Sequence, residues 1–301
     1  RNWILGLRVV TGAGDILHLN KSLVKNNTGY DFRHLFIGSE GTLGIISEAT
    51  LQLTAPPKPS TVCVFGVEKF DYLIEVLKIC KSMLRVNAFE FFCNNALRRV
   101  LEAHRYPRPL DTDSPFYALV DLENTEIETE TVFEVYSKCV DKKLITDGVI
   151  SQSVAQARAL WKLREDISET LWHFQPYKND ISVRISRMGD FLRDINQLLQ
   201  KNYPDFEVIW YGHIGDGNIH LNILKPKNLS TLKFKSFCYG VSMSLGELIS
   251  NYEGSISAEH GVGLLKKDSL KFSRSEDEIN LMKSIKKIFD PNAILNPGKL
   301  I

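Results

Sequence analysis

Two histidines flank a tight-turn signal in the stretch Tyr211–Asn222, which reads YGHIGDGNIHLN. Asp216-Gly217 at its centre is typical of a two-residue type I′ hairpin turn. A turn there places His213 directly opposite His220, and such cross-strand partners have Cβ atoms about 4.5–5.5 Å apart. Asn222 shares their face because side chains alternate along a strand. The stretch therefore predicts an imidazole pair able to bind one cation; the alternative is two ordinary histidines on a solvated hairpin face.

A second polar cluster, Ser257–Gly263, reads SAEHGVG. Glu259 could add a carboxylate to the two imidazoles, and two histidines with one glutamate and an open position form a catalytic zinc arrangement. His260 would then be left as a base. Adjacent residues of a regular strand point to opposite faces, so both can serve one site only if the backbone leaves the strand conformation. Gly261 and Gly263 permit that departure; the alternative is a surface turn.

Cationic and hydroxyl side chains form a candidate anion-binding group. Arg164 and Ser168 stand four residues apart on a predicted helix, 155–172, and so share a face. Lys178 follows that helix. Arg164 could grip a carboxylate with two parallel hydrogen bonds, and Lys178 could add a point charge. The alternative is a solvated cationic face.

The elements that must position these residues alternate along the chain. Residues 4–10 and 16–19 predict a hairpin and 49–54 a strand, and the proline-rich stretch 55–60 predicts a domain boundary. Beyond it, strand and helix patterns alternate, which indicates a sheet covered by helices. We predict strands at 61–67, 88–92, 116–123, 149–151, 180–185 and 255–258, a hairpin at 207–224, and helices at 72–84, 95–104, 131–143, 155–172, 188–202, 234–252 and 277–289.

Composition excludes several classes of protein. The 301 residues carry a net charge of +1, and no basic block suggests a nucleic-acid partner. No apolar run approaches the roughly 18–20 residues of a membrane span. The five cysteines are scattered and form no C-x-x-C pair. They indicate buried, reduced thiols, and neither a disulfide framework nor a thiolate zinc site.

Several of these pieces, in this order, resemble one family. The chain resembles the D-2-hydroxyglutarate dehydrogenases, flavoproteins of the vanillyl-alcohol-oxidase type. The strongest match is Tyr211–Asn222 together with Ser257–Gly263. The others are Asn27–Asp31, Leu35–Ile46, Trp161–Glu165 and Ile294–Lys299.

The resemblance implies roles for individual residues. It implies zinc ligands at His213, His220 and Glu259, and a catalytic base at His260. Substrate-holding positions match Arg164, Ser168, Lys178 and Asn222, with Ser168 in place of a common threonine. Arg184 stands where related chains commonly have proline. Flavin-lining positions match Ser39, Gly41, Thr42, Gly44, Ile46 and Asn296. Imidazole and carboxylate also suit manganese or cobalt, so the metal stays open between these and zinc.

The resemblance also implies an α+β fold. Residues 1–55 would be the trailing part of an FAD-binding domain, 56–285 an antiparallel-sheet cap domain that binds substrate, and 286–301 a segment returning to the flavin domain. Family members have a further N-terminal region that holds the FAD pyrophosphate, so we expect this chain to be incomplete and to bind FAD poorly alone.

The implied reaction is FAD-dependent oxidation of a D-2-hydroxy acid, most simply D-2-hydroxyglutarate to 2-oxoglutarate, assisted by zinc. Implied partners are the dicarboxylate substrate, an electron-transferring flavoprotein as acceptor and a second copy in a homodimer, and the implied location is mitochondrial. The alternatives are a D-lactate dehydrogenase of the same family, a zinc hydrolase and a non-catalytic remnant.

Overall fold

The chain folds into two compact units. A computed structural model describes residues 1–123 and 126–301. One unit comprises Arg1–Pro56 with Glu259–Ile301, and the other comprises Pro57–Ala258. The chain first passes from one unit to the other between Pro56 and Pro57, inside the predicted boundary stretch 55–60. The functional division into 1–55, 56–285 and 286–301 stays a prediction.

The first unit is built on a small antiparallel sheet of order β2-β1-β3, with β1 at Ile4–Thr11, β2 at Ile16–Leu19 and β3 at Gly44–Leu51. The predicted hairpin is confirmed, since Val10 pairs with Ile16. The strand predicted at 49–54 begins earlier, at Gly44. A Cβ at Gly44 would lie 2.5 Å from Val9 Cγ1 and 2.9 Å from Phe36 Cε1. Glycine is therefore required there for internal packing.

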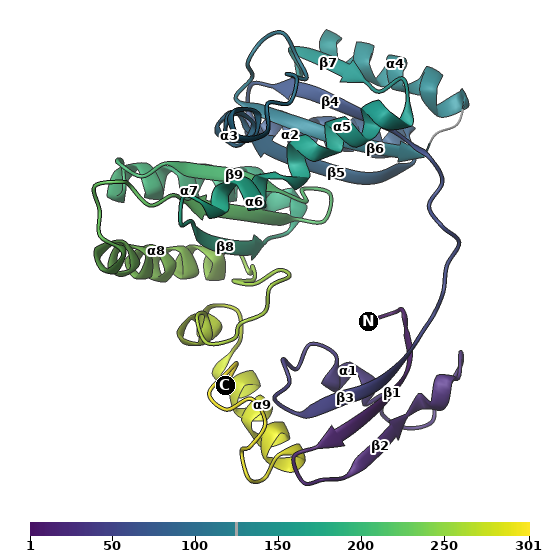
Figure 1. Cartoon of the computed structure of the whole chain (residues 1–301), viewed down its shortest axis with the longest axis vertical. Coiled ribbons are helices and arrows are strands. Elements are labelled where there is room, and N and C mark those ends of the chain that lie inside the picture. Colours follow the sequence, from purple (N-terminus) through teal and green to yellow (C-terminus); the bar gives the residue numbers. More distant parts are fainter. Residues whose placement is uncertain (124–125) are drawn as a thin grey trace. The chain divides into compact units, whose positions relative to one another are not determined.

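The C-terminal helix α9, Glu276–Phe289, packs in this same unit (Figure 1). Its start is fixed by a capping box between Ser275 and Glu278. Near its end, the Phe289 ring meets the ring of Phe36 edge-on, with centroids 5.0 Å apart. Lys286 Nζ donates to the carbonyl of Thr42 at 2.9 Å. These contacts join the two ends of the sequence into one core.

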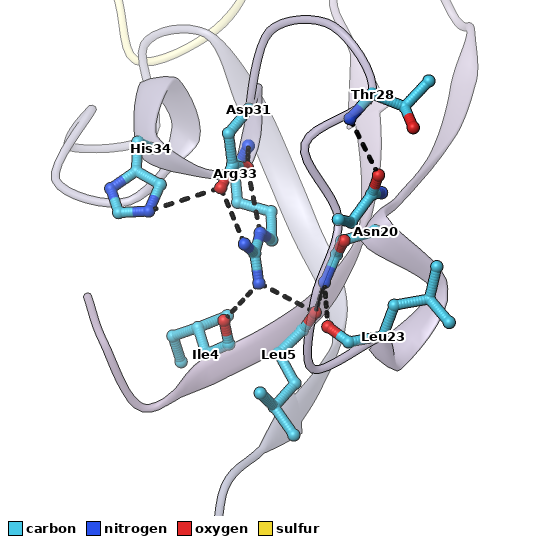
Figure 2. A network of polar contacts seen from close by, with 9 residues as sticks. Ile4, Leu5, Asn20, Leu23, Thr28, Asp31, Arg33 and His34 are labelled. Carbon is cyan, nitrogen blue, oxygen red and sulfur yellow. Dashed lines mark hydrogen bonds and ion pairs between the residues drawn. The ribbon is translucent and has the colours of Figure 1, made fainter.

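A polar network fastens the loop before the short helix α1, Arg33–Phe36, to strand β1 (Figure 2). Arg33 Nη1 donates to the carbonyls of Ile4 and Leu5, at 2.7 and 2.9 Å. Asp31 holds the same guanidinium through Nε and Nη2. The hydrogen bond from Arg33 is the main reason why the pKa of the Asp31 carboxyl lies below its ordinary value. Asp31, the last residue of the stretch Asn27–Asp31, thus has a structural role, because it fixes the Arg33 side chain that is hydrogen-bonded to β1.

The second unit contains a seven-stranded antiparallel sheet of order β7-β4-β6-β5-β9-β10-β8 (Figure 1). This arrangement confirms the predicted antiparallel sheet. The strands are β4 at Ser60–Val67, β5 at Val86–Cys93, β6 at Phe116–Glu123, β7 at Asp147–Ile150, β8 at Tyr177–Ser182, β9 at Val208–Gly212 and β10 at Asn218–Ile223. The predicted strand 255–258 forms only isolated bridges, Ser255 with Ser182 and Ser257 with Asp180.

Helices cover both faces of this sheet. On one face, α3 (Asn94–His104), α5 (Val154–Glu165) and α6 (Ile167–Trp172) pack over the side chains of Val64, Phe92, Tyr211 and their neighbours. A second layer contains α2 (Phe70–Met83), α4 (Glu126–Asp141), α7 (Met188–Asn202) and α8 (Thr231–Asn251). In α7 the buried positions recur at helical spacing, which explains its docking.

The prediction of a single helix at 155–172 is wrong in one respect, because the structure has two helices over this range. The break lies at Asp166, which separates α5 from α6. The Asp166 carboxylate accepts a hydrogen bond from the Tyr106 hydroxyl at 2.7 Å. The spacing of apolar residues along the helix gives no sign of this tertiary contact. Arg164 and Ser168 consequently stand on two successive helices.

All five cysteines are free and buried, as predicted. Burial raises the pKa of the Cys63 and Cys238 thiols to about 12. Among the described residues, no helix is both long and apolar enough to cross a membrane.

Candidate metal centre

The hairpin β9–β10 has a different register from the one predicted. His220 pairs with Tyr211 and Asn222 with Ile209, so residues 213–217 form a five-residue loop. The predicted two-residue turn at Asp216-Gly217 is therefore wrong. Gly217 makes tertiary contacts instead: its carbonyl accepts a hydrogen bond from the Val183 N–H at 3.1 Å, and a Cβ there would lie 2.3 Å from the carbonyl oxygen of Val183. Gly217 is thus seated against the segment after β8, with a φ of +89°.

The two histidines nevertheless meet. Their ring centroids are 5.4 Å apart, with the rings edge to face. Extending the register places His213 opposite Asn218, one diagonal step from His220. The register differs from the predicted one by two residues, and a slip of two keeps every side chain on its own face, whereas a slip of one would reverse it. The structure thereby brings together the imidazole pair that the sequence predicted.

Each imidazole has a carboxylate at its Nδ1 atom. Glu90, on β5, places Oε1 2.7 Å from His213 Nδ1. Asp180, on β8, places Oδ1 3.6 Å from His220 Nδ1 and accepts a hydrogen bond from Asn218 Nδ2 at 2.8 Å. Glu90 and Asp180 are only 4% and 1% exposed. Carboxylates behind histidines commonly fix the orientation of metal-binding imidazoles.

Glu259 and His260 follow Ala258, whose backbone N–H donates to the carbonyl of Asp180 at 3.3 Å. One ligand atom each of His213, His220 and Glu259 lies within 4.8 Å of the other two, and the same holds for Asp180, His220 and His260. The backbone leaves the strand conformation here, as two adjacent functional side chains require. Gly261 and Gly263 have φ values of +76° and +53°.

This donor set fits a divalent cation. Two imidazoles and one carboxylate form the ligand set of many catalytic zinc sites, and the two buried carboxylates supply second-layer partners. The same donors also suit other first-row metals, so they do not select zinc alone. The roles of His213, His220, Glu259 and His260 stay predictions.

The predicted anion-binding residues lie on the same face of the sheet. Lys178 pairs in register with Asn222, and its Nζ donates to Ser168 Oγ at 3.0 Å. Both polar atoms of the Asn222 side chain are buried without a hydrogen-bond partner in the described part of the chain. A buried, unsatisfied amide is costly, which is consistent with a polar ligand at this position.

Arg164 differs from the simple expectation of an open carboxylate clamp. Its side chain is buried, with Nη2 2.9 Å from Glu90 Oε2 and the guanidinium carbon 4.6 Å from the centre of the Tyr211 ring. The contact with Glu90 is an ion pair without hydrogen-bond geometry. Arg164 therefore already has an internal carboxylate partner. Arg184, the other arginine of interest, is exposed and pairs with Glu253 at 2.7 Å.

The predicted flavin-lining residues lie in the first unit and divide into two groups. Ser39, Thr42 and Gly44 are buried, and the Thr42 hydroxyl donates to the carbonyl of Ser39 at 2.6 Å. Exposed positions are Gly41, Ile46 and Asn296. Gly41 has a φ of +71°, and a Cβ there would come no closer than 3.9 Å to Asn296. Open space above backbone in the left-handed region suits close approach of a planar cofactor. The flavin contacts stay a prediction.

A carboxylate that the sequence did not single out organises this region. Glu40 accepts hydrogen bonds from the backbone N–H groups of Val262 and Gly263, each at 2.7 Å. The amide of Asn296 donates to the Glu40 carbonyl. Glu40 thus holds the loop that directly follows Glu259 and His260.

Comparison with known proteins identifies the family. Residues 56–300 match the family model described as FAD linked oxidases, C-terminal domain. The chain belongs to this family. It is 50% identical, over its full length, to proteins named D-2-hydroxyglutarate dehydrogenase from Stutzerimonas stutzeri and from Xanthomonas citri, and spans 65% and 64% of those proteins. A relative from Danio rerio named "D-2-hydroxyglutarate dehydrogenase, mitochondrial" is 36% identical, and the chain spans 56% of it.

Solved structures of low sequence identity share the fold. A 4-ethylphenol oxidase from Gulosibacter chungangensis superposes with a TM-score of 0.69 at 14% identity, covering 99% of this chain and 65% of that one. An alkyldihydroxyacetonephosphate synthase superposes with a TM-score of 0.63 at 17% identity, covering 98% and 54%. At these identities the likeness establishes the α+β architecture of FAD-linked oxidases and nothing about substrate.

Proposed function

We propose that this chain contributes the substrate- and metal-binding part of an FAD-dependent dehydrogenase that oxidises D-2-hydroxyglutarate to 2-oxoglutarate. The observation that carries the proposal is the pair His213 and His220, each with a buried carboxylate at Nδ1 and both on the face that bears Lys178 and Asn222. The names of the two relatives at 50% identity support the same substrate.

The protein residues would divide the work of removing a proton from the C2 hydroxyl. His260 is the residue we assign as base; a positioned base typically accelerates such a step about 10²–10⁴-fold. An alcohol proton is far too basic for an unaided imidazole of pKa about 6.5. A divalent cation held by His213, His220 and Glu259 would supply Lewis-acid stabilisation of the negative charge on the hydroxyl oxygen. FAD held by the predicted flavin-lining residues, Gly41 and Asn296 among them, would supply the hydride acceptor for the oxidation at C2.

Recognition of the far end of the substrate would fall to Lys178 and Ser168. Lys178 Nζ donates a hydrogen bond to the Ser168 hydroxyl, which holds the ammonium beside that residue. Asn222, next to Lys178 in register, offers an amide that no described side chain satisfies. A second carboxylate would satisfy both. Arg164, already paired with Glu90, would add positive charge behind them.

The test compares two substrates and one metal-ligand variant. The flavin-loaded enzyme should show a higher kcat/KM for D-2-hydroxyglutarate than for D-lactate, because only the former has a second carboxylate. His213→Ala should lose the bound metal, measured by elemental analysis after gel filtration. Metal content unaffected by His213→Ala would refute the ligand assignment.

A D-lactate dehydrogenase is the second candidate. A Schizosaccharomyces pombe relative named a putative mitochondrial D-lactate dehydrogenase is 35% identical, and the chain spans 58% of it. A preference for D-lactate in the same assay would decide for this candidate. Activity on an ester or amide without flavin would instead favour a zinc hydrolase, and a protein that binds metal but turns over neither acid would be a non-catalytic remnant.

We further propose an electron-transferring flavoprotein as acceptor and a homodimeric assembly, both by analogy with the family. A mitochondrial location is supported by the names of eukaryotic relatives, whereas the relatives at 50% identity are bacterial.

A further inference from the structure

We infer that Glu90 is a positioning residue, one that sets the protonation pattern of His213 so that its Nε2 lone pair faces the metal position. The inference rests on the proposed metal centre, but it concerns a residue that neither the motif nor the family resemblance assigns. It follows from three features of Glu90: its burial, its two partners and its place on a central strand.

Burial makes the Glu90 carboxylate an unusual choice for its position. It lies in the strand sequence Ala-Phe-Glu-Phe-Phe, surrounded by apolar residues, and is 4% exposed. A buried carboxylate is costly unless charges or hydrogen bonds compensate it. Glu90 forms a buried ion pair with Arg164. Replacing both members of such a pair by apolar residues is often neutral or stabilising, so the presence of the pair indicates a task other than stability.

The two oxygens of Glu90 face different partners. Oε1 lies 2.7 Å from His213 Nδ1, and Oε2 lies 2.9 Å from Arg164 Nη2. An ionised carboxylate only accepts hydrogen bonds, so the hydrogen must reside on His213 Nδ1. In the neutral ring the lone pair is then on Nε2, which is the form that binds a metal. The pairing with the Arg164 guanidinium stabilises the carboxylate as this acceptor.

The strand holds this arrangement rigidly. Phe92, on the same face two residues after Glu90, pairs in register with Tyr211, two residues before His213. The loop that carries His213 is tied back to the same strand, since the N–H of Gly215 donates to the Phe89 carbonyl at 3.1 Å. Glu90 therefore sits on a fixed backbone opposite the histidine that it orients.

A glutamine at this position should reverse the tautomer. Glu90→Gln has a single amide oxygen, and the positive guanidinium of Arg164, 2.9 Å from the present Oε2, attracts that partly negative oxygen more strongly than the neutral imidazole does. The amide NH₂ would then face His213 Nδ1 and donate to it, which moves the ring hydrogen to Nε2. A hydrogen on Nε2 blocks the metal. Loss of such second-layer partners typically weakens metal binding about 10–100-fold.

Two measurements on the full chain test this. The first is the tautomer of His213 in the metal-free protein, from imidazole ¹⁵N shifts of ¹⁵N-histidine-labelled samples, with His213→Gln used for assignment. The second is Zn²⁺ affinity by competition with a chromophoric chelator. Asp121→Asn is the matched control, because Asp121 is another buried carboxylate of the sheet but binds Trp161 Nε1 and Asn87 Nδ2. Glu90→Asp keeps the charge on a shorter arm and serves if Glu90→Gln fails to fold.

We expect the hydrogen on Nδ1 in the wild type and in Asp121→Asn, on Nε2 in Glu90→Gln, and a 10–100-fold weaker zinc affinity only in Glu90→Gln. Glu90→Asp should retain the wild-type tautomer. An unchanged tautomer in Glu90→Gln, or zinc affinity within twofold of a wild type that binds zinc, overturns the inference. A wild type that binds no zinc overturns the proposed function instead, while the tautomer still decides the role of Glu90.

Discussion

The buried ion pair between Arg164 and Glu90 yields the sharpest stability prediction. Arg164→Met removes the guanidinium, whose carbon lies 4.6 Å from the centre of the Tyr211 ring, but keeps an unbranched apolar side chain at this position. Two unit charges 2.9 Å apart attract by about 6 kcal/mol at an effective dielectric constant of about 20. Most of that attraction offsets the cost of burying Glu90. Breaking such a pair from one side typically destabilises a protein by about 3–5 kcal/mol, because a charge remains buried alone.

The double variant distinguishes this cause from simple loss of packing. Glu90→Gln combined with Arg164→Met removes both charges, so its loss should be smaller than the sum of the two single losses by about 2 kcal/mol or more. Urea unfolding followed by tryptophan fluorescence suits this measurement, because three of the four tryptophans, Trp161, Trp172 and Trp210, lie in the unit Pro57–Ala258. Additive losses would show that the two charges do not stabilise each other, and would refute the role of Arg164 as the partner that stabilises the buried Glu90 carboxylate.

Four further outcomes follow from the structure. His260→Ala should reduce kcat of the flavin-loaded enzyme by about 10²–10⁴-fold while metal content stays unchanged, as elemental analysis would show. Lys178→Met should raise KM for D-2-hydroxyglutarate more than KM for D-lactate, and equal effects in steady-state kinetics would refute its role. The five buried thiols, with pKa values raised by burial, should react with a thiol reagent at about pH 8 only after denaturation. Asp31, whose folded pKa is lowered mainly by its hydrogen bond to Arg33, stabilises the fold above its unfolded pKa of about 3.9 and loses this contribution as pH falls through the folded value. Asp31→Asn should therefore lower Tm at about pH 6 more than at about pH 2.5.

Much of the fold was predictable because the spacing of apolar residues within a short segment indicates whether that segment forms a helix or a strand. The helix predicted at 188–202 matches α7 residue for residue, and its buried positions Met188, Phe191, Ile195 and Leu199 recur at helical spacing. The strand predicted at 116–123 coincides with β6. The break at Asp166 was not predictable in this way, because the apolar periodicity continues across it; the tertiary partner of its carboxylate, the Tyr106 hydroxyl, lies 60 positions away in the sequence.

The histidine pair was predicted through a partly wrong argument. The Asp-Gly turn signal placed the two rings directly opposite, whereas the structure places them one diagonal step apart across a longer loop. The two histidines still share a face because a register shift of two residues, like any even shift, leaves every side chain on its own face of the sheet. Had the register differed from the predicted one by a single residue, His213 and His220 would lie on opposite faces of the sheet.

The carboxylates behind the histidines show where local sequence ceases to be informative. A lone acidic residue in an apolar strand indicates a buried carboxylate with a polar partner, and Glu90 is such a residue. Asp121, in the apolar strand next to it, carries the same signal, yet its partners are Trp161 and Asn87. The difference lies in which strand becomes the neighbour: β5 pairs with β9, the strand that leads into His213, whereas β6 lies between β4 and β5. Strand order is a property of the whole sheet, so the partner of a buried carboxylate, and with it the distinction between a structural and a functional one, follows only from the tertiary pairing.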